Sequence, residues 1–248
     1  MHEKHWSEGV TRIAVLTGAG ISTDSGIPDY RGPDGVWTKN PAAASLFTYA
    51  NYMADTEVRQ QFWCAYADHA AWRAEPNDAH HALAELDTAG LAVRVLTQNI
   101  DGLHQRTALA ERKVLELHGS MRSTVCTRCG AKTSTESVLA RIPAEPDPPC
   151  RNCGGILKLA IVLFGQPLDA GVLGQARTIA AASQVFLAIG SSLQVEPAAS
   201  LCSIAVRAGA KLVIINRDPT PYDDEAVEVI REPIATAVRH IRKFVTDR

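Results

Sequence analysis

The sequence predicts an α/β protein built around a doubly wound parallel sheet. Four runs of aliphatic and β-branched residues each end in small or polar residues, at 12–17, 93–97, 185–189 and 212–215. Runs that are apolar at nearly every position are typical of parallel strands covered by helices on both faces. Ligands of such sheets bind beyond the carboxyl ends of the strands, so the polar residues that follow each run indicate a site.

The predicted helices lie between and after these strands, at 79–89, 171–183, 197–208 and 233–245. Two segments break the alternation of strands and helices. Residues 42–76 carry aromatic side chains at helical spacing and predict a small helical insert. Residues 122–157 contain paired cysteines and a Pro-rich loop, so we expect a second insert there.

The 248 residues have the composition of an ordinary globular protein, 46% hydrophobic and 21% charged. The formal net charge is -2. The chain therefore lacks the excess of basic residues that would indicate nucleic acid as a main ligand. The longest apolar runs are too short to cross a bilayer, and we expect no membrane partner. Because no apolar run follows the first charged residues, we expect no signal peptide and a cytoplasmic location.

Four of the six cysteines form two close pairs, Cys126-x2-Cys129 and Cys150-x2-Cys153. Two such knuckles can bring four thiolates into one tetrahedral zinc site, and the glycines after each pair permit tight turns. A redox dithiol is the alternative, but two matched knuckles in a loop-rich segment favour a metal. Because four cysteine ligands leave no open coordination position, we expect one structural zinc ion.

Gly18-Ala19-Gly20 follows the first strand and precedes an expected helix, as in a pyrophosphate-binding turn. The match to the dinucleotide fingerprint is incomplete, because Thr23 stands where a third glycine would fall and the usual acidic residue is missing. The motif by itself fits a plain tight turn equally well. In the loop at 26–32, Arg31 could pair with a phosphate and Tyr30 could cover an aromatic ring, although an exposed surface loop would look the same.

Five blocks occur in a consistent order, at 18–22, 26–31, 97–104, 117–119 and 190–193. Together they resemble the signature motifs of the sirtuin family. The paired cysteines fall between His118 and Phe164-Gly165, which is where that family has them. The resemblance extends over residues 12–220, which is most of the chain.

The resemblance implies a Rossmann-like large domain formed by residues 1–35, 78–121 and 158–248. A small domain would be inserted into it, with a helical module at 36–77 and a zinc-ribbon module at 122–157. NAD and an acyl-lysine peptide would enter the cleft between the two domains. The implied activity is that of an NAD-dependent protein-lysine deacylase, which releases nicotinamide and O-acyl-ADP-ribose.

The cofactor-binding positions implied by the resemblance come from three parts of the chain. They are Gly18, Ala19, Gly20, Asp29, Tyr30, Arg31, Gln98, Asn99, Ile100, Asp101, Gly190, Ser191, Ser192 and Asn216. The first part, at 18–31, is expected near the phosphates and the nicotinamide ribose. The second, at 98–101, would hold the ribose and the nicotinamide amide, and the third, at 190–216, the adenosine half.

His118, Asn99 and Asp101 are the expected catalytic residues. In the family mechanism, cleavage of the nicotinamide–ribose bond creates an electrophilic carbon, which the acyl oxygen traps when it is held nearby. A histidine then takes a proton from a ribose hydroxyl, and that hydroxyl attacks the trapped acyl group. Imidazole suits the step because its ordinary pKa lies near neutral pH. Among the eight histidines His118 stands in the matching motif, whereas His104 is expected to support the site or the packing around it.

Val162 and Phe164-Gly165 resemble the edge that binds a substrate backbone by strand addition. Gln166 stands where the family commonly has an acid, so one negative charge near the peptide is missing. This difference bears on substrate preference and leaves the expected reaction unchanged.

Trp63 and Tyr66 are the expected acyl-pocket residues. Family members that remove succinyl or malonyl groups have a Tyr-x-x-Arg pair there, whose cation meets the acyl carboxylate. Without a cation a buried carboxylate lacks a partner, so neutral acyl groups are expected. The segment at 32–38 resembles the branch of the family with long-chain deacylase and ADP-ribosyltransferase activity.

Three alternatives remain open. A mono-ADP-ribosyltransferase would use the same NAD cleft with another nucleophile. A catalytically silent module that binds NAD or acyl-lysine is disfavoured because Asn99, Asp101 and His118 are all present. A dehydrogenase is disfavoured by the incomplete glycine fingerprint. The sequence indicates neither the physiological substrate nor the oligomeric state.

Overall fold

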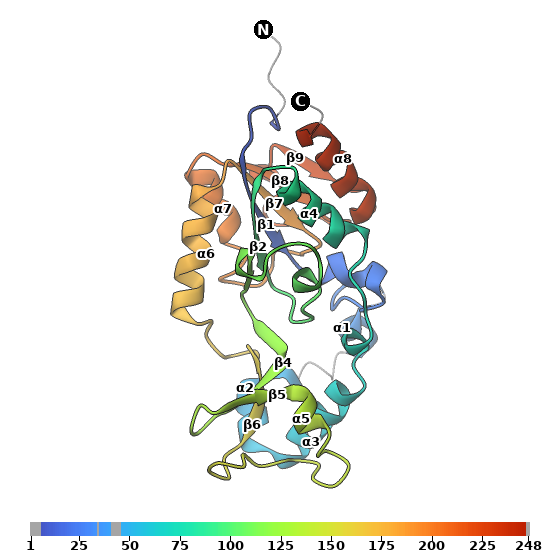
Figure 1. Ribbon diagram of the computed structural model, residues 1–248, viewed down its shortest axis with the longest axis vertical. Helices are drawn as coiled ribbons and strands as arrows, with labels where there is room; N and C mark the ends of the chain where they lie inside the picture. The colour runs from blue at the N-terminus through green and yellow to red at the C-terminus, as the bar shows by residue number, and fades with distance from the viewer. Residues whose placement is uncertain (1–5, 34, 41–45, 247–248) are drawn as a thin grey trace.

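The computed structural model describes residues 6–33, 35–40 and 46–246, with side chains as far as residue 241. Two sheets organise the chain and follow one another along the long axis of the molecule (Figure 1). Residues 41–45 of the expected helical module lie outside the described residues. Within the described ranges no helix has both the length and the apolar character needed to span a bilayer.

The larger sheet has six parallel strands in the order β3-β2-β1-β7-β8-β9. They are β1 (Arg12–Thr17), β2 (Ala92–Thr97), β3 (Val114–Glu116), β7 (Val185–Ile189), β8 (Lys211–Ile215) and β9 (Glu228–Ile230). The four predicted strands form the centre, and the predicted fold class is confirmed. The chain builds outward from β1 through β2 and β3, then returns to the other side of β1 with β7. Such a switch point is where open α/β sheets bind ligands.

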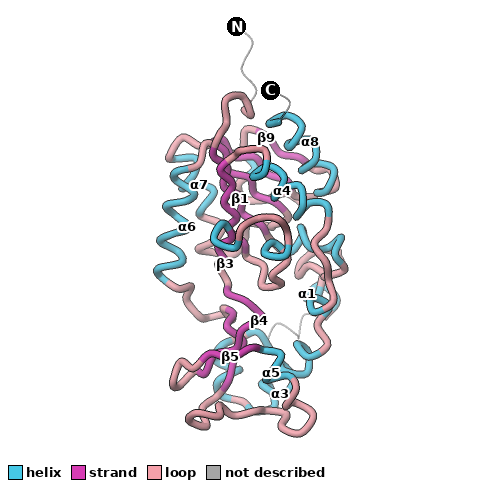
Figure 2. Tube along the Cα trace, in the orientation of Figure 1, coloured by secondary structure: helices cyan, strands magenta, loops and turns pink. Residues whose placement is uncertain are grey.

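Helices cover both faces of this sheet (Figures 1 and 2). One face carries α4 (Asp78–Thr88) and α8 (Ile234–Thr246), and the other carries α6 (Ala170–Ala182) and α7 (Leu201–Arg207). In β1, Ile13 and Val15 pack in the apolar cluster of the first face, whereas Ala14 and Leu16 pack in that of the second. Both faces of the strand are therefore buried, which explains why the run is apolar at each position from Ile13 to Leu16.

The smaller sheet is antiparallel, with the order β5-β4-β6. Its strands are β4 (Gly119–Cys126), β5 (Lys132–Ser134) and β6 (Leu157–Ile161), and the helix α5 (Thr135–Leu139) follows β5. Against it pack the helices of the expected helical insert, α2 (Tyr49–Ala54), α3 (Thr56–Ala67) and η3 (Ala70–Trp72). The shared apolar core includes Phe62 and Trp63 from α3, and Leu159 and Ile161 from β6. The short remaining elements are the 3-10 helices η1 (Ala19–Ser25), η4 (His104–Arg106), η5 (Glu111–Lys113) and η6 (Asp223–Glu225), and α1 (Val36–Lys39).

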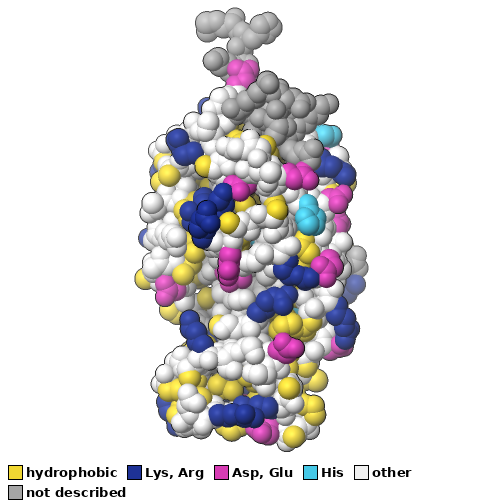
Figure 3. All heavy atoms as spheres, in the orientation of Figure 1, with side chains coloured by type: hydrophobic (Ala, Val, Ile, Leu, Met, Phe, Trp, Pro, Cys, Tyr) yellow, Lys and Arg dark blue, Asp and Glu magenta, His cyan; other side chains and the backbone are white. Residues whose placement is uncertain are grey.

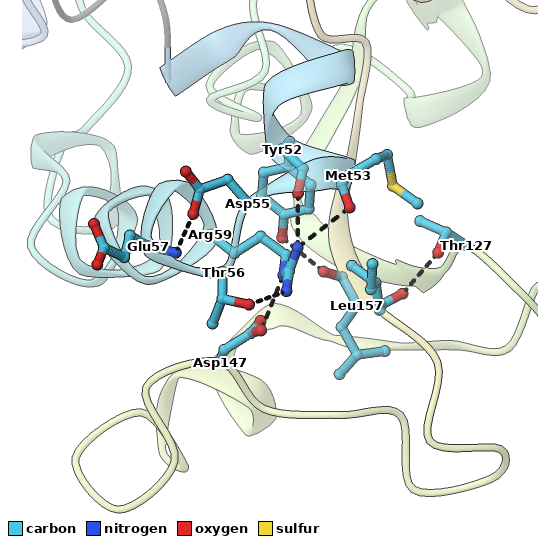
Figure 4. Close-up of polar contacts among 10 residues, drawn as sticks. Tyr52, Met53, Asp55, Thr56, Glu57, Arg59, Thr127, Asp147 and Leu157 are labelled. Atoms are coloured by element: carbon cyan, nitrogen blue, oxygen red, sulfur yellow. Dashed lines mark hydrogen bonds and ion pairs between the residues drawn. The ribbon is translucent and has the colours of Figure 1, made fainter.

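Arg59 of α3 joins the helical module to the loop that carries the second cysteine pair (Figure 4). Its Nε donates to Asp147 Oδ2 at 2.9 Å, Nη1 to Tyr52 O at 3.1 Å and Nη2 to Thr56 Oγ1 at 2.8 Å. The Tyr52 hydroxyl donates to Leu157 O, at the start of β6, at 2.6 Å. A buried guanidinium requires such partners because it is costly to remove from water unpaired.

Basic and acidic side chains are interspersed on the face of the molecule drawn in Figure 3. This mixture agrees with the formal net charge of -2.

Candidate active site

A cavity of about 1090 Å³ opens at the carboxyl ends of β1, β2, β7 and β8 and extends to the segment after β6. Most residues predicted from the sequence line it. These are Gly18, Ala19, Gly20, Asp29, Tyr30, Arg31, Tyr66, Gln98, Asn99, Ile100, His118, Val162, Phe164, Gly165, Gly190, Ser191, Ser192 and Asn216. Of the predicted catalytic, cofactor-binding and substrate-binding residues, the remaining two, Asp101 and Trp63, are buried behind the lining.

The loops after β1 and β7 meet backbone to backbone, and the contact depends on their glycines. The Gly20 N–H donates to Gly190 O at 2.9 Å. A Cβ added to Gly18 would lie 2.6 Å from Gly190 O, and one added to Gly20 would lie 2.8 Å from Gly190 Cα. Side chains are therefore excluded from this edge of the cavity, which leaves the backbone open to a close ligand.

The helix expected at the glycine motif is the short 3-10 helix η1, which begins at Ala19 directly after Gly18. Gly26, in the left-handed conformation with φ 81°, ends η1 after Ser25. The short helix turns Ser22 inward, where it is 1% exposed. The glycine motif thus leads into a buried polar contact and not into a long dinucleotide-binding helix.

The loop after η1 is closed by Asp29, whose Oδ1 accepts a backbone N–H three residues further on at 2.8 Å. Tyr30 and Trp37 place their ring centroids 4.7 Å apart, and the Arg31 guanidinium carbon lies 4.6 Å from the Trp37 centroid. Burial raises the pKa of Tyr30, with a smaller contribution from the charge of Asp101, and burial lowers the pKa of Arg31. The loop thereby presents an aromatic surface and a cation to the cavity.

Asn99 is fixed from two sides. Its backbone N–H donates to Thr97 Oγ1 at 3.0 Å, and its Nδ2 donates to Ser22 Oγ at 3.1 Å. The Ser22 hydroxyl in turn donates to Asp101 Oδ2 at 2.8 Å. Asp101 is 5% exposed and acts on Asn99 through Ser22. Nδ2 uses one of its two N–H donors on Ser22, so the amide oxygen of Asn99 and its second N–H remain for a ligand.

The hydrogen bonding of His118 defines its tautomer. Its Nδ1 lies 3.0 Å from Gln98 O, and a carbonyl can only accept, so Nδ1 carries the proton and Nε2 carries the lone pair. Burial lowers the pKa of His118, and the bond to Gln98 raises it by a smaller amount. The ring therefore lines the cavity as a neutral imidazole that can accept a proton at Nε2 near neutral pH.

The segment after β6 forms a strand-like wall of the cavity beside His118. The Val162 N–H donates to His118 O at 2.8 Å, and the Phe164 N–H donates to Phe47 O at 2.8 Å. The carbonyl of Phe164 accepts from Tyr49 N–H at 2.9 Å. Phe164 is 42% exposed, and the centroid of its ring lies 5.2 Å from that of Trp37. An extended wall with an exposed aromatic ring is suited to binding an extended peptide.

Comparison with known proteins decides the family. The model of the Sir2 family matches residues 18–197. The chain belongs to the Sir2 family. This confirms the resemblance seen in the sequence.

A relative from Streptomyces coelicolor, named NAD-dependent protein deacetylase 2, is 58% identical over 231 residues, which cover 93% of this chain and 96% of the relative. A solved histidine-to-alanine variant of Sir2, with deacetylated p53 peptide and 3'-O-acetyl ADP ribose, has a TM-score of 0.86 at 37% identity, covering 96% of this chain and 94% of that one. A solved Sir2 with p53 peptide and NAD+ has a TM-score of 0.85 at 36% identity, covering 96% and 95%.

The four paired cysteines of this Sir2 protein form one cluster, with the sulfur atoms of Cys126, Cys129, Cys150 and Cys153 all within 4.8 Å of one another. The Sγ atoms of Cys126 and Cys153 are 3.6 Å apart, and those of Cys129 and Cys150 are 3.8 Å apart. A tetrahedral zinc ion with Zn–S bonds of about 2.3 Å separates its sulfur ligands by roughly 3.8 Å. The cluster therefore fits zinc with four protein ligands.

Trp63 and Tyr66 are neighbours on α3 of the Sir2 protein, but only Tyr66 lines the cavity. Trp63 is 0% exposed and packs inside the core of the small sheet and helical module. Burial raises the pKa of Tyr66 well above its ordinary value, so the hydroxyl stays neutral. Beside it, Phe47 also lines the cavity, with ring centroids 6.3 Å apart.

Sequence reasoning did not single out Ser22, Trp37 or Phe47 as site residues. Ser22 belongs to the first motif block, and its link between Asn99 and Asp101 is made only in three dimensions. Trp37 and Phe47 lie in segments rich in aromatic residues, and from the sequence such residues fit a packed core as well as a binding site. Their place in the cavity depends on the contact between the helical module and the segment after β6.

Proposed function

We propose that this Sir2 protein is an NAD-dependent protein-lysine deacylase, which acts on neutral acyl groups and releases nicotinamide and O-acyl-ADP-ribose. The observation that carries the proposal is a neutral His118, with its lone pair on Nε2, in the lining of the cavity that Asn99 also lines. The names of the relative and of the solved complexes agree with this activity.

Three groups of residues would hold NAD. The backbone of Gly18 to Gly20 and the cation of Arg31 would bind the phosphates. The amide oxygen of Asn99 would accept from the nicotinamide-ribose half, with Asp101 as a positioning residue behind Ser22. Residues 190–192 and Asn216 would hold the adenosine half. When bound, NAD supplies an electrophilic ribose carbon and the hydroxyl that receives the acyl group.

His118 would take the proton from that ribose hydroxyl at Nε2. The bond from Nδ1 to Gln98 O holds the ring in the required tautomer before and after the transfer. The same bond stabilises the protonated ring, because Nδ1–H is a donor in both states. The bond from Val162 N–H to His118 O ties this histidine to the wall that would bind the peptide.

The acyl-lysine would enter along Val162, Phe164 and Gly165, with the acyl group directed toward Tyr66 and Phe47. These two rings would pack against a neutral acyl chain. A buried acyl carboxylate there would face aromatic surface and pay a desolvation cost without a charge partner. This favours acetyl and longer aliphatic groups over succinyl and malonyl groups.

We further propose the division into a discontinuous large domain and a two-module small domain. The two separate sheets support it, although β4 starts before residue 122 and β6 continues past residue 157. We also propose a cytoplasmic location, because a site of four thiolates suits a reducing compartment.

Replacing His118 by alanine tests the assignment. His118→Ala should lower O-acyl-ADP-ribose formation at least about a hundredfold, because general-base catalysis contributes about that much. NAD affinity, measured by calorimetric titration, should change little. His240→Ala is the matched control, because His240 is exposed and paired with Glu232. Wild-type turnover in His118→Ala would contradict the assignment. Transfer of label from NAD to protein, without O-acyl-ADP-ribose, would instead indicate an ADP-ribosyltransferase.

A further inference from the structure

We propose that His104 is a positioning residue, which fastens the base of the loop 97–104 to β1 through Thr17 and so holds Asn99 in the cavity. The inference rests on the proposed function insofar as it assigns the consequence to NAD chemistry. The contact itself is a property of the folded chain and can be measured without turnover.

The loop begins and ends on the same hydroxyl of β1. Thr17 and Thr97 are paired at the ends of β1 and β2, and the Thr17 hydroxyl donates to Thr97 Oγ1 at 2.8 Å. His104 begins η4 at the far end of the loop, and its Nε2 lies 3.0 Å from Thr17 Oγ1. Thr97 Oγ1 also accepts the Asn99 backbone N–H at 3.0 Å. One polar chain therefore links His104, Thr17, Thr97 and Asn99.

Counting the protons assigns the role of His104 in this chain. The single Thr17 hydroxyl proton is donated to Thr97, so Thr17 Oγ1 can only accept from His104. The Nε2 of His104 therefore carries a proton. Burial lowers the pKa of His104 well below its ordinary value, with a smaller contribution from His80, whose ring centroid is 4.8 Å away. The neutral ring with its proton on Nε2 is the form that makes this contact.

Complete burial gives the contact its importance. Thr17 is 0% exposed, His104 1% and Thr97 2%. If the Nε2–H donor were lost, water could not readily replace it at Thr17, and the hydroxyl chain would lose its fixed direction. Asn99 would keep its side-chain bond to Ser22, but the Thr97 hydroxyl that accepts its backbone N–H would be held less firmly. His104 is not among the residues that line the cavity, so its effect passes through Asn99.

A matched pair of substitutions separates the donor from the volume of the side chain. His104→Gln can keep an N–H near the position of Nε2, whereas His104→Leu fills the space with no donor. Thr17→Val removes the other partner at nearly constant shape. In wild type and His104→Gln, exchange of the Asn99 backbone N–H with solvent deuterium should be slow. In His104→Leu and Thr17→Val it should be faster by about tenfold, the loss expected for one buried hydrogen bond.

The same variants should show a selective kinetic effect. His104→Leu and Thr17→Val should lower kcat by about tenfold, while His104→Gln stays within about threefold of wild type. The KM for the acyl peptide should stay within about twofold, because Val162 to Gly165 is not touched. The double variant His104→Leu/Thr17→Val should be no worse than Thr17→Val alone, since Thr17→Val already removes the contact that His104→Leu removes.

Three results would overturn the inference. The first is an unchanged exchange rate of the Asn99 N–H in both His104→Leu and Thr17→Val. The second is an equal loss of kcat in His104→Gln and His104→Leu, and the third is an additive loss of kcat in the double variant. Failure of the proposed function gives a different result. In that case wild type forms no O-acyl-ADP-ribose, yet the exchange of the Asn99 N–H still tests the contact. If His104→Leu does not fold, Thr17→Val and His104→Gln provide the same comparison.

Discussion

Removing Asp147 should destabilise the protein because it leaves the Arg59 guanidinium buried without its carboxylate. The side chains of Arg59 and Asp147 are 9% and 21% exposed, and Nε and Oδ2 are 2.9 Å apart (Figure 4). Breaking a fully buried ion pair by removing one partner costs about 3–5 kcal/mol. Two features reduce that cost here. Asp147 is partly exposed, and Arg59 keeps its bonds to Tyr52 O and Thr56 Oγ1. We therefore expect Asp147→Ala to lower the free energy of unfolding by about 2–3 kcal/mol.

Urea unfolding followed by circular dichroism measures this change. Asp147→Asn keeps an oxygen acceptor for Arg59 Nε and should lose less than Asp147→Ala. Asp68→Ala is the matched control, because the pair of Arg73 and Asp68 is 85% and 86% exposed. The control should change the free energy of unfolding by at most about 0.5 kcal/mol. Equal, small effects of Asp147→Ala and Asp68→Ala would refute the view that Arg59 joins the helical module to the cysteine-bearing loop.

Three further outcomes are expected. Removing zinc with a chelator should unfold the β5-β4-β6 sheet and weaken peptide binding, with recovery when zinc is restored; a folded, active protein after chelation would contradict a structural zinc. Burial lowers the pKa of His118, and below that pKa the ring is protonated and cannot accept a proton. The acid limb of kcat against pH should therefore lie below the ordinary imidazole value of 6.5, and a limb above it would count against this base. Gly20→Ala would place a Cβ 2.8 Å from Gly190 Cα, so NAD affinity should fall by about tenfold or more, and an unchanged Kd in a calorimetric titration would contradict the contact.

The central strands could be predicted because burial on both faces makes each of them a continuous apolar run in the sequence. In β1 each position from Ile13 to Leu16 faces one of two apolar clusters, so the run itself indicates a covered parallel strand. The edge strands β3 (Val114–Glu116) and β9 (Glu228–Ile230) could not be predicted in the same way. Each is short and contains a glutamate. Each becomes a strand because its backbone pairs with a longer neighbouring strand, β3 with β2 and β9 with β8.

The sequence predicted most residues of the candidate site but not the contacts that join them. Spacing alone gave the four-cysteine cluster, because two knuckles bring their ligands together locally. The motif blocks gave Asn99, Asp101 and His118, but no spacing indicates that Asp101 acts through Ser22. Trp63 and Tyr66 are three residues apart on one helix, and tertiary packing decides that one faces the core and the other the cavity.

The most direct test of the function is a product assay of the purified protein with NAD and an acetyl-lysine peptide. Nicotinamide, deacetylated peptide and O-acetyl-ADP-ribose are quantified together by mass spectrometry, with and without the peptide. A deacylase with His118 as its base should release nicotinamide when the peptide is present and form the three products in equal amounts. Nicotinamide release that is independent of the peptide, or formed without O-acetyl-ADP-ribose, would contradict the proposed function.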